Sequence, residues 1–190
     1  MSERIGIFGG AFDPPHVGHV LAVQYVLLTA PVERVFVIPC AQHPFGKHVS
    51  PFEHRCAMCR LAFGPLGERV EVLDLEGKRR GASYTIDTIR ELSRRFPEAE
   101  FELIVGSDIV EELPQWREVE ELKRLATLRV LPRLPERASG RRGAEDENGP
   151  YYLPAVSGTT LRRMLAEGRD LSAHVPREVL AYIERERLYR

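Results

Sequence analysis

The 190-residue chain has few cysteines, no excess of charge of either sign and no long apolar run. Its cysteines, Cys40, Cys56 and Cys59, are odd in number, which argues against a disulfide framework. A formal net charge of −1 leaves no broad basic surface, so nucleic acid is not an expected partner. No stretch approaches the ~20 apolar residues of a membrane span, and the N-terminus enters a strand-like stretch without a signal peptide. We therefore expect a cytoplasmic protein with no membrane partner.

The most informative part of the sequence is the run from Gly9 to His19, Gly-Gly-Ala-Phe-Asp-Pro-Pro-His-Val-Gly-His. It joins a strand-like stretch to a long apolar, helix-like stretch. Gly9 and Gly10 allow positive φ and the close approach of a ligand to the main chain. If a helix begins near His16, both histidines share its first turn, where exposed N–H groups and the helix dipole favour anions. The run indicates a polyphosphate site. A metal half-site or a structural turn is the alternative, although two histidines do not complete a zinc shell.

Short stretches rich in branched and aromatic residues recur along the chain and alternate with segments of helical periodicity. The stretches are 5–8, 35–38, 70–73, 101–105, 128–131 and 151–153. This order predicts an α/β fold with a Rossmann-like, doubly wound parallel sheet in a single domain over 1–190, followed by a C-terminal helical segment. Residues 133–150 are almost free of apolar side chains, so we expect a mobile surface loop there.

Two helix starts and one cysteine pair can be interpreted locally. Ser50 is placed as the N-cap of a capping box, and Ser83 or Thr85 can cap the next helix. Cys56 and Cys59 form a Cys-x-x-Cys, but they fall on an apolar stripe at helical spacing. Packing is therefore favoured over redox or metal chemistry for this pair.

The run from Gly9 to His19 resembles the His-x-Gly-His signature of nucleotidyltransferases related to class I aminoacyl-tRNA synthetases, in the form typical of nicotinate-nucleotide adenylyltransferases. Those enzymes join nicotinate mononucleotide to ATP, release pyrophosphate and form the dinucleotide precursor of NAD. Further segments are similar to that family: 83–85 (Ser-Tyr-Thr), 106–108 with 114–116 (Gly-Ser-Asp and Pro-Gln-Trp), 156–162 (Val-Ser-Gly-Thr-Thr-Leu-Arg) and the C-terminal 179–190. The resemblance thus runs nearly end to end.

Taken without the family, these segments are ambiguous. Asp108 at the end of a strand can bind ribose hydroxyls or cap a turn, and the single tryptophan, Trp116, can stack on a flat ring or belong to the core. The segments 83–85 and 157–162 are also typical helix starts. Hydroxyls, amides and the Arg162 guanidinium at the start near 157 would form a second phosphate cradle, facing the one formed by the run from Gly9 to His19.

The resemblance implies a role for each matching residue. Phosphate binding and stabilisation of the leaving pyrophosphate fall to His16, His19, Lys47 and Arg162. ATP binding falls to Gly9, Gly10, Phe12, Gly18, Gly106, Asp108, Ser157 and Thr159. Binding of the pyridine mononucleotide falls to Asp13, Tyr84, Thr85 and Trp116. Mg²⁺ is expected to travel on the ATP phosphates, with no metal site of the protein's own.

The sequence departs from the family pattern in three places, the mildest of which is Ser107, where the family commonly has alanine. Residues 40–48 replace the usual Pro-Pro-His-Lys, and Lys47 is the candidate for its phosphate-binding lysine. In the helix that follows, Arg55 and Met58 match the arginine and methionine of the family. Gly158 stands where the family has a second serine, which removes one hydroxyl.

We therefore expect transfer of AMP from ATP to nicotinate mononucleotide. The alternatives are a related transferase acting on nicotinamide mononucleotide, phosphopantetheine or another phosphorylated acceptor, and a nucleotide-binding regulator or RNA-binding relative without turnover. Whether the chain forms a homo-oligomer is left open by the sequence.

Overall fold

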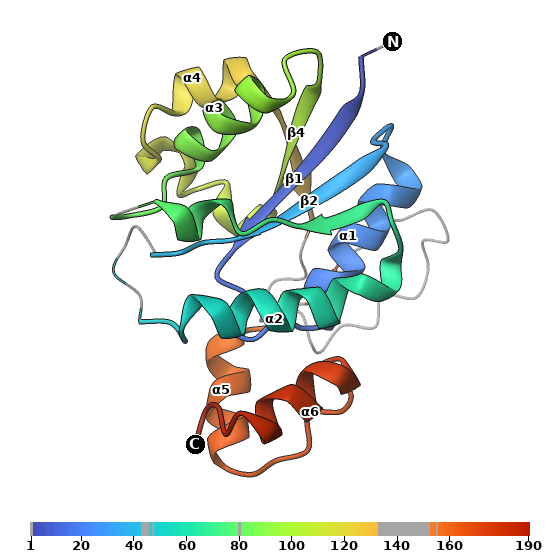
Figure 1. Cartoon of the computed structure of the whole chain (residues 1–190), viewed down its shortest axis with the longest axis vertical. Helices are drawn as coiled ribbons and strands as arrows, with labels where there is room; N and C mark the ends of the chain where they lie inside the picture. The colour runs from blue at the N-terminus through green and yellow to red at the C-terminus, as the bar shows by residue number, and fades with distance from the viewer. Residues whose placement is uncertain (1, 43–45, 47, 80, 133–152, 155) are drawn as a thin grey trace.

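A five-stranded, all-parallel sheet forms the centre of the computed structural model, which describes residues 2–42, 46, 48–79, 81–132, 153–154 and 156–190 (Figure 1). The strand order is β3-β2-β1-β4-β5. The strands are β1 (Arg4–Gly10), β2 (Arg34–Pro39), β3 (Val70–Val72), β4 (Glu100–Gly106) and β5 (Ala126–Leu131). The predicted doubly wound α/β fold is confirmed. Of the sixth predicted stretch only Leu153 is described, its N–H donating to the Pro132 carbonyl at 2.9 Å; residues 133–150 lie outside the described residues.

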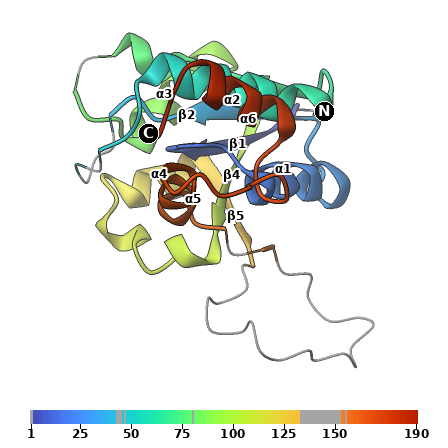
Figure 2. The ribbon, with the colours of Figure 1, turned by 90° about the horizontal axis from the view of Figure 1, so that it is seen from below.

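Helices cover both faces of this sheet. They are α1 (Val17–Thr29), α2 (Phe52–Phe63), α3 (Thr85–Arg95), α4 (Val119–Leu125), α5 (Gly158–Ala166) and α6 (Arg177–Arg185). Short 3₁₀ turns connect them: η1 (Gly64–Leu66), η2 (Leu75–Lys78), η3 (Ser107–Ile109) and η4 (Leu113–Gln115). In Figure 1, α3 and α4 cover one face and α1 and α2 the other, and α6 packs against α2 in both views (Figures 1 and 2).

The core has two layers because side chains alternate along the buried parallel strands. Ile5 and Ile7 of β1 pack with Ile86 and Ile89 of α3, whereas Phe8 faces the α1 and α2 side. The central strands β1, β2 and β4 are therefore nearly continuous apolar runs, which is the signal that located them in the sequence.

Cys56 and Cys59 belong to this packing. Both are free thiols on α2, at most 3% exposed, and burial raises the pKa of each. The interpretation of the pair as core residues is confirmed.

Two predicted helix caps are wrong. α2 begins after Pro51, and no side-chain hydrogen bond caps it. Tyr84, not Ser83 or Thr85, is the N-cap residue of α3. Ser50 and Ser83 instead bond to loops distant in sequence: the Ser50 N–H donates to Asp13 at 3.1 Å, and the Ser83 hydroxyl accepts from the Ala41 N–H at 3.1 Å. Tertiary partners have replaced the local ones.

Within the described part of the chain, no helix is long and apolar enough to cross a membrane.

Candidate functional site

The site lies where the strand order reverses. Strand β1 pairs with β2 on one side and β4 on the other, and their carboxyl ends open into a cavity of about 650 Å³. A reversal of this kind is where ligands bind in open parallel sheets. The residues that line the cavity include Gly9 and Gly10 from β1, His19 from α1, Gly106 from β4, and Asp108, Tyr84, Thr85 and Trp116.

Gly9 and Gly10 are the last two residues of β1, paired with Ile38 and Pro39 of β2. Neither has positive φ, so that expectation is wrong: the ladder holds both in extended conformation, and the left-handed residue of the loop is Phe12, at φ 49°. A Cβ on Gly9 would meet nothing nearer than the Ile38 carbonyl oxygen at 4.0 Å. Gly9 therefore leaves the cavity open next to the main chain.

The two histidines lie together at the start of α1. His16 is the N-cap residue, as predicted, and its ring stacks on that of His19 with 3.6 Å between centroids. The His16 backbone N–H donates to His19 Nδ1 at 3.2 Å. Only His19 of the two lines the cavity among the described residues; His16 is buried behind it. The His19 imidazole therefore lies at the cavity wall, with the His16 ring stacked behind it at the N-terminus of α1, where helix N–H groups are exposed.

Two residues assigned to ATP support these histidines without lining the cavity. Phe12 is buried and packs edge-on against His19, 4.9 Å between centroids, and against Phe63 of α2. Gly18 keeps space for the His16 ring, because a Cβ there would lie 3.2 Å from His16 Nδ1. Each fixes the position of an imidazole.

Asp13 is a junction of three distant segments. Its buried carboxylate accepts hydrogen bonds from the Tyr189 hydroxyl at 2.5 Å and the Ser50 N–H at 3.1 Å, and its carbonyl accepts from Arg162 Nη1 at 2.7 Å. Burial, and then the hydrogen bond to Asp13, raises the pKa of Tyr189 above its ordinary value. Asp13 is therefore the residue that fastens α5 and the C-terminal segment to the histidine loop, and it does not line the cavity.

The start of α5 is where the sequence predicts a second phosphate cradle, and its Ser157, Thr159 and Arg162 lie outside the cavity lining. Ser157 is its N-cap, with the hydroxyl accepting from the Thr160 N–H at 3.5 Å, and Arg162 Nη2 donates to Thr159 at 3.2 Å. A Cβ on Gly158 would lie 3.2 Å from the Asp13 carbonyl oxygen, so this helix start packs closely on the loop. The structure thus brings the two helix N-termini together, as the sequence predicts.

The cavity lining also includes two aromatic residues and an arginine. Tyr84, Thr85 and Trp116 line the cavity, and the Arg117 guanidinium lies 4.9 Å from the centre of the Tyr84 ring. Arg117 also lines the cavity and pairs with Asp87 at 3.9 Å and Glu118 at 3.4 Å. A half-buried indole beside a cation offers a stacking surface and a charge to an anionic ring substituent.

Deeper in the cavity lie a thiol and a carboxylate. Burial raises the pKa of Cys40, which keeps its thiol neutral. Glu76 is buried, and its Oε1 accepts from the Thr88 hydroxyl at 2.6 Å, which in turn accepts from Arg79 at 2.9 Å. This chain of hydrogen bonds fixes η2 to α3 behind the pocket.

Arg55 is a structural determinant whose role the sequence does not reveal. It is fully buried on α2, and its guanidinium donates to three main-chain carbonyls, those of Ala11 (2.8 Å), Ser50 (2.8 Å) and Ala41 (3.1 Å). It thereby joins the loops after β1 and β2. The available signal was an arginine three and four residues before the buried Met58 and Cys59, on the apolar face of a helix.

Lys47 lies outside the described residues. Among those described, no group of three or more histidine, cysteine or acidic side chains is placed to hold a metal ion.

The chain is similar to known proteins over nearly its whole length. The cytidylyltransferase-like family model matches residues 7–164. A probable nicotinate-nucleotide adenylyltransferase of Thermus thermophilus is 40% identical, with 98% of this chain and all of that protein covered. One of Anaeromyxobacter dehalogenans (strain 2CP-C) is 39% identical, covering 99% and 97%. In fold, the chain is similar to Plasmodium falciparum nicotinic acid mononucleotide adenylyltransferase complexed with NaAD, with a TM-score of 0.78, 19% identity and coverage of 98% and 97%.

Proposed function

The chain belongs to the cytidylyltransferase-like family, within its nicotinate-nucleotide adenylyltransferases, and from this we propose that it transfers AMP from ATP to nicotinate mononucleotide. The products are nicotinate adenine dinucleotide and pyrophosphate, and the reaction is a step of NAD biosynthesis. The observation that carries the proposal is a single cavity with the His16–His19 pair on one side and the Trp116 and Thr85 ring pocket on the other. A cavity of this kind suits a ligand with a polyphosphate at one end and a flat ring at the other.

The reaction needs positioning and charge stabilisation. The mononucleotide phosphate is already an anion, so it attacks the α-phosphorus of ATP in line without a covalent enzyme intermediate. The bond to the β-phosphate oxygen breaks, and pyrophosphate leaves with the electron pair. His16 and His19, with the N–H groups of α1, bind the phosphates where charge grows. Arg162 from α5 and Lys47 neutralise the leaving group, and ATP enters as its Mg²⁺ complex.

Three residues outside the cavity lining act by holding the histidine loop and its rings. Asp13 is assigned here to alignment of the histidine loop, and Phe12 and Gly18 to the imidazoles. Gly106, Asp108, Ser157 and Thr159 are assigned to ATP. Tyr84 and Thr85 bind the pyridine nucleotide, and Trp116 stacks on its ring.

The acid is favoured over the amide as substrate because of Arg117. Arg117 lines the same cavity as Trp116, with its guanidinium over the Tyr84 ring, and nicotinate differs from nicotinamide by a negative charge on the ring substituent. A nearby cation stabilises the acid more than the neutral amide.

The test is pyrophosphate release with ATP and each of nicotinate mononucleotide, nicotinamide mononucleotide and phosphopantetheine. We expect turnover with nicotinate mononucleotide at the highest kcat/KM, slower turnover with the amide and none with phosphopantetheine. Fastest turnover with another acceptor would replace the substrate assignment. Binding of ATP without pyrophosphate release from any acceptor would indicate a regulator.

A further inference from the structure

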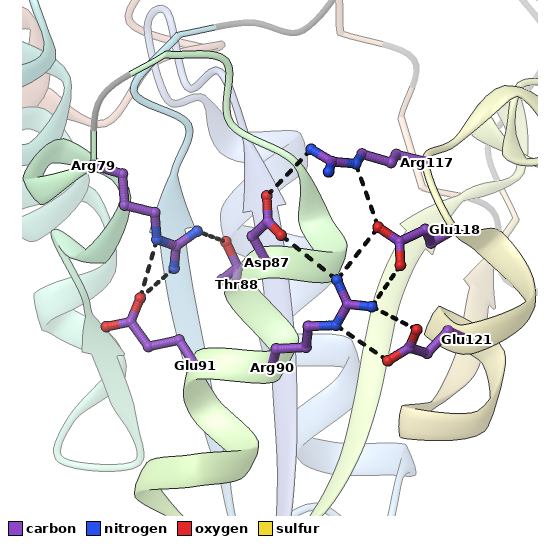
Figure 3. A network of polar contacts seen from close by, with 8 residues as sticks. All are labelled: Arg79, Asp87, Thr88, Arg90, Glu91, Arg117, Glu118 and Glu121. Carbon is purple, nitrogen blue, oxygen red and sulfur yellow. Dashed lines mark hydrogen bonds and ion pairs between the residues drawn. The ribbon is translucent and has the colours of Figure 1, made fainter.

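Arg90, in the middle of α3, binds two carboxylates, that of Glu118 at the N-cap of α4 and that of Glu121 within α4. Its guanidinium donates to Glu121 at 3.1 Å and 2.5 Å, and to Glu118 at 3.3 Å and 2.5 Å. Both carboxylates are thus bound through two hydrogen bonds each, as Figure 3 shows. Paired hydrogen bonds of this kind fix direction as well as distance.

The network continues to both sides of the pocket. Arg90 lies 3.8 Å from Asp87, and Arg117 connects Glu118 with Asp87, at 3.4 Å and 3.9 Å. Asp87 is two residues beyond Thr85, and Glu118 is two residues beyond Trp116 (Figure 3). The residues expected to grip the pyridine ring are therefore joined, behind the pocket, through Arg90.

Apart from this network, the described contacts of the Trp116 segment are short turns and the packing of Trp116 against the core layer that contains α3. Between β4 and α4 the chain forms two 3₁₀ turns of three residues each, η3 and η4, with Leu113 buried at the second. Glu118 itself is left-handed, at φ 52°. Short turns of this type do not define a rigid wall by main-chain hydrogen bonding alone.

We propose that Arg90 is a positioning residue, which sets the distance of Trp116 from α3 and so the width of the ring pocket. It touches no substrate and lies outside the cavity lining. The kinetic part of this inference rests on the proposed function, whereas the position of Trp116 in the free protein does not.

The experiment uses Trp116 as its own reporter, since it is the single tryptophan of the chain. Arg90→Gln removes the charge, Arg90→Lys keeps the charge without the planar fork, and Glu121→Gln weakens the contact from the other side. Arg94→Gln is the matched control, on the same helix, exposed and without an ion pair among the described residues. Acrylamide quenching of tryptophan fluorescence is measured in the free, full-length protein. KM for each substrate, kcat and urea unfolding are measured in parallel.

We expect Arg90→Gln to increase quenching and to raise KM for the pyridine mononucleotide by about three- to tenfold, the range of a paired charge contact. KM for ATP and kcat should each change by less than about twofold. Arg90→Lys and Glu121→Gln should fall between wild type and Arg90→Gln, and Arg94→Gln should match wild type.

Unchanged quenching and KM in Arg90→Gln, with folding intact, would overturn the proposal. So would equal increases of KM for both substrates, which mark a general loss of stability. If no acceptor is turned over, the proposed function fails, but the quenching of the four variants still decides the role of Arg90. If Arg90→Gln does not fold, Glu121→Gln carries the same comparison.

Discussion

The Tyr189 hydroxyl donates a 2.5 Å hydrogen bond to the Asp13 carboxylate, which joins two residues 176 positions apart. Tyr189→Phe removes this bond from the carboxylate of Asp13, a residue that is only 4% exposed. We expect the free energy of unfolding to fall by about 1.5–3 kcal/mol, the usual contribution of a hydrogen bond to a charged group. Urea unfolding at neutral pH measures this loss of stability. Tyr182→Phe removes a hydroxyl that is bonded to His54 instead, and it should affect turnover less than Tyr189→Phe does.

The same contact predicts a pH dependence. Folding raises the pKa of Tyr189 above its ordinary 10.0, so above that pH the unfolded chain loses a proton that the native state keeps. The contribution of Tyr189 to the free energy of unfolding is complete below about pH 10. It falls as the pH rises further, by up to ~1.4 kcal/mol per pH unit. The difference in unfolding free energy between wild type and Tyr189→Phe should shrink from pH 9 to pH 11. A constant difference would contradict this.

Arg55→Met should be more damaging than any surface substitution. It leaves the carbonyls of Ala11, Ala41 and Ser50 without their donor in a buried place. Because an unsatisfied buried polar group costs about 1–3 kcal/mol, we expect a loss of several kcal/mol in unfolding free energy. Arg60→Met, on the exposed side of the same helix, is the control. Thermal unfolding distinguishes the two, and equal midpoints would show that Arg55 is not a structural anchor.

His19→Ala should keep the fold and lose turnover. The loss of one preorganised donor to a developing charge typically reduces the rate by ~10²–10³. Pyrophosphate release under saturating substrates measures it, with circular dichroism to verify folding. His54→Ala, whose side chain bonds to Tyr182 outside the cavity, should retain turnover. Near wild-type turnover in His19→Ala would remove this residue from the mechanism.

Arg117→Gln should reduce the preference for nicotinate over nicotinamide mononucleotide. The ratio of the two kcat/KM values should fall about two- to fivefold, in keeping with a partly exposed ion pair. Arg124→Gln removes a charge from the exposed side of α4 and should leave the ratio as it is. If both variants lower the ratio equally, the effect is one of net charge.

The sheet and the histidine loop could be predicted from the sequence because their signals are local. Buried parallel strands are nearly continuous apolar runs, and His16 and His19 are three residues apart at a helix start, so their proximity follows from helix geometry. Gly168, left-handed just beyond α5, and Pro176, just before α6, are local signals of the same kind for a helix end and a helix start.

The remaining features depend on contacts between distant segments. Ser50 has the sequence of a cap, but its N–H bonds to Asp13, and Ser83 holds the loop at Ala41. In the sequence, Arg117 is indistinguishable from a surface arginine. Only the packing of the η4 segment near α3 brings it to the cavity. Tertiary contacts override local capping preferences, because one helix cap contributes only about 1 kcal/mol to stability.

The junction at Asp13 also bears on the order of folding. It joins residues 13, 50, 162 and 189, and contacts so far apart in sequence add to the contact order and close late, because chain entropy opposes them until the intervening sheet has formed. We therefore expect the histidine loop, which comes early along the chain, to be completed late in folding.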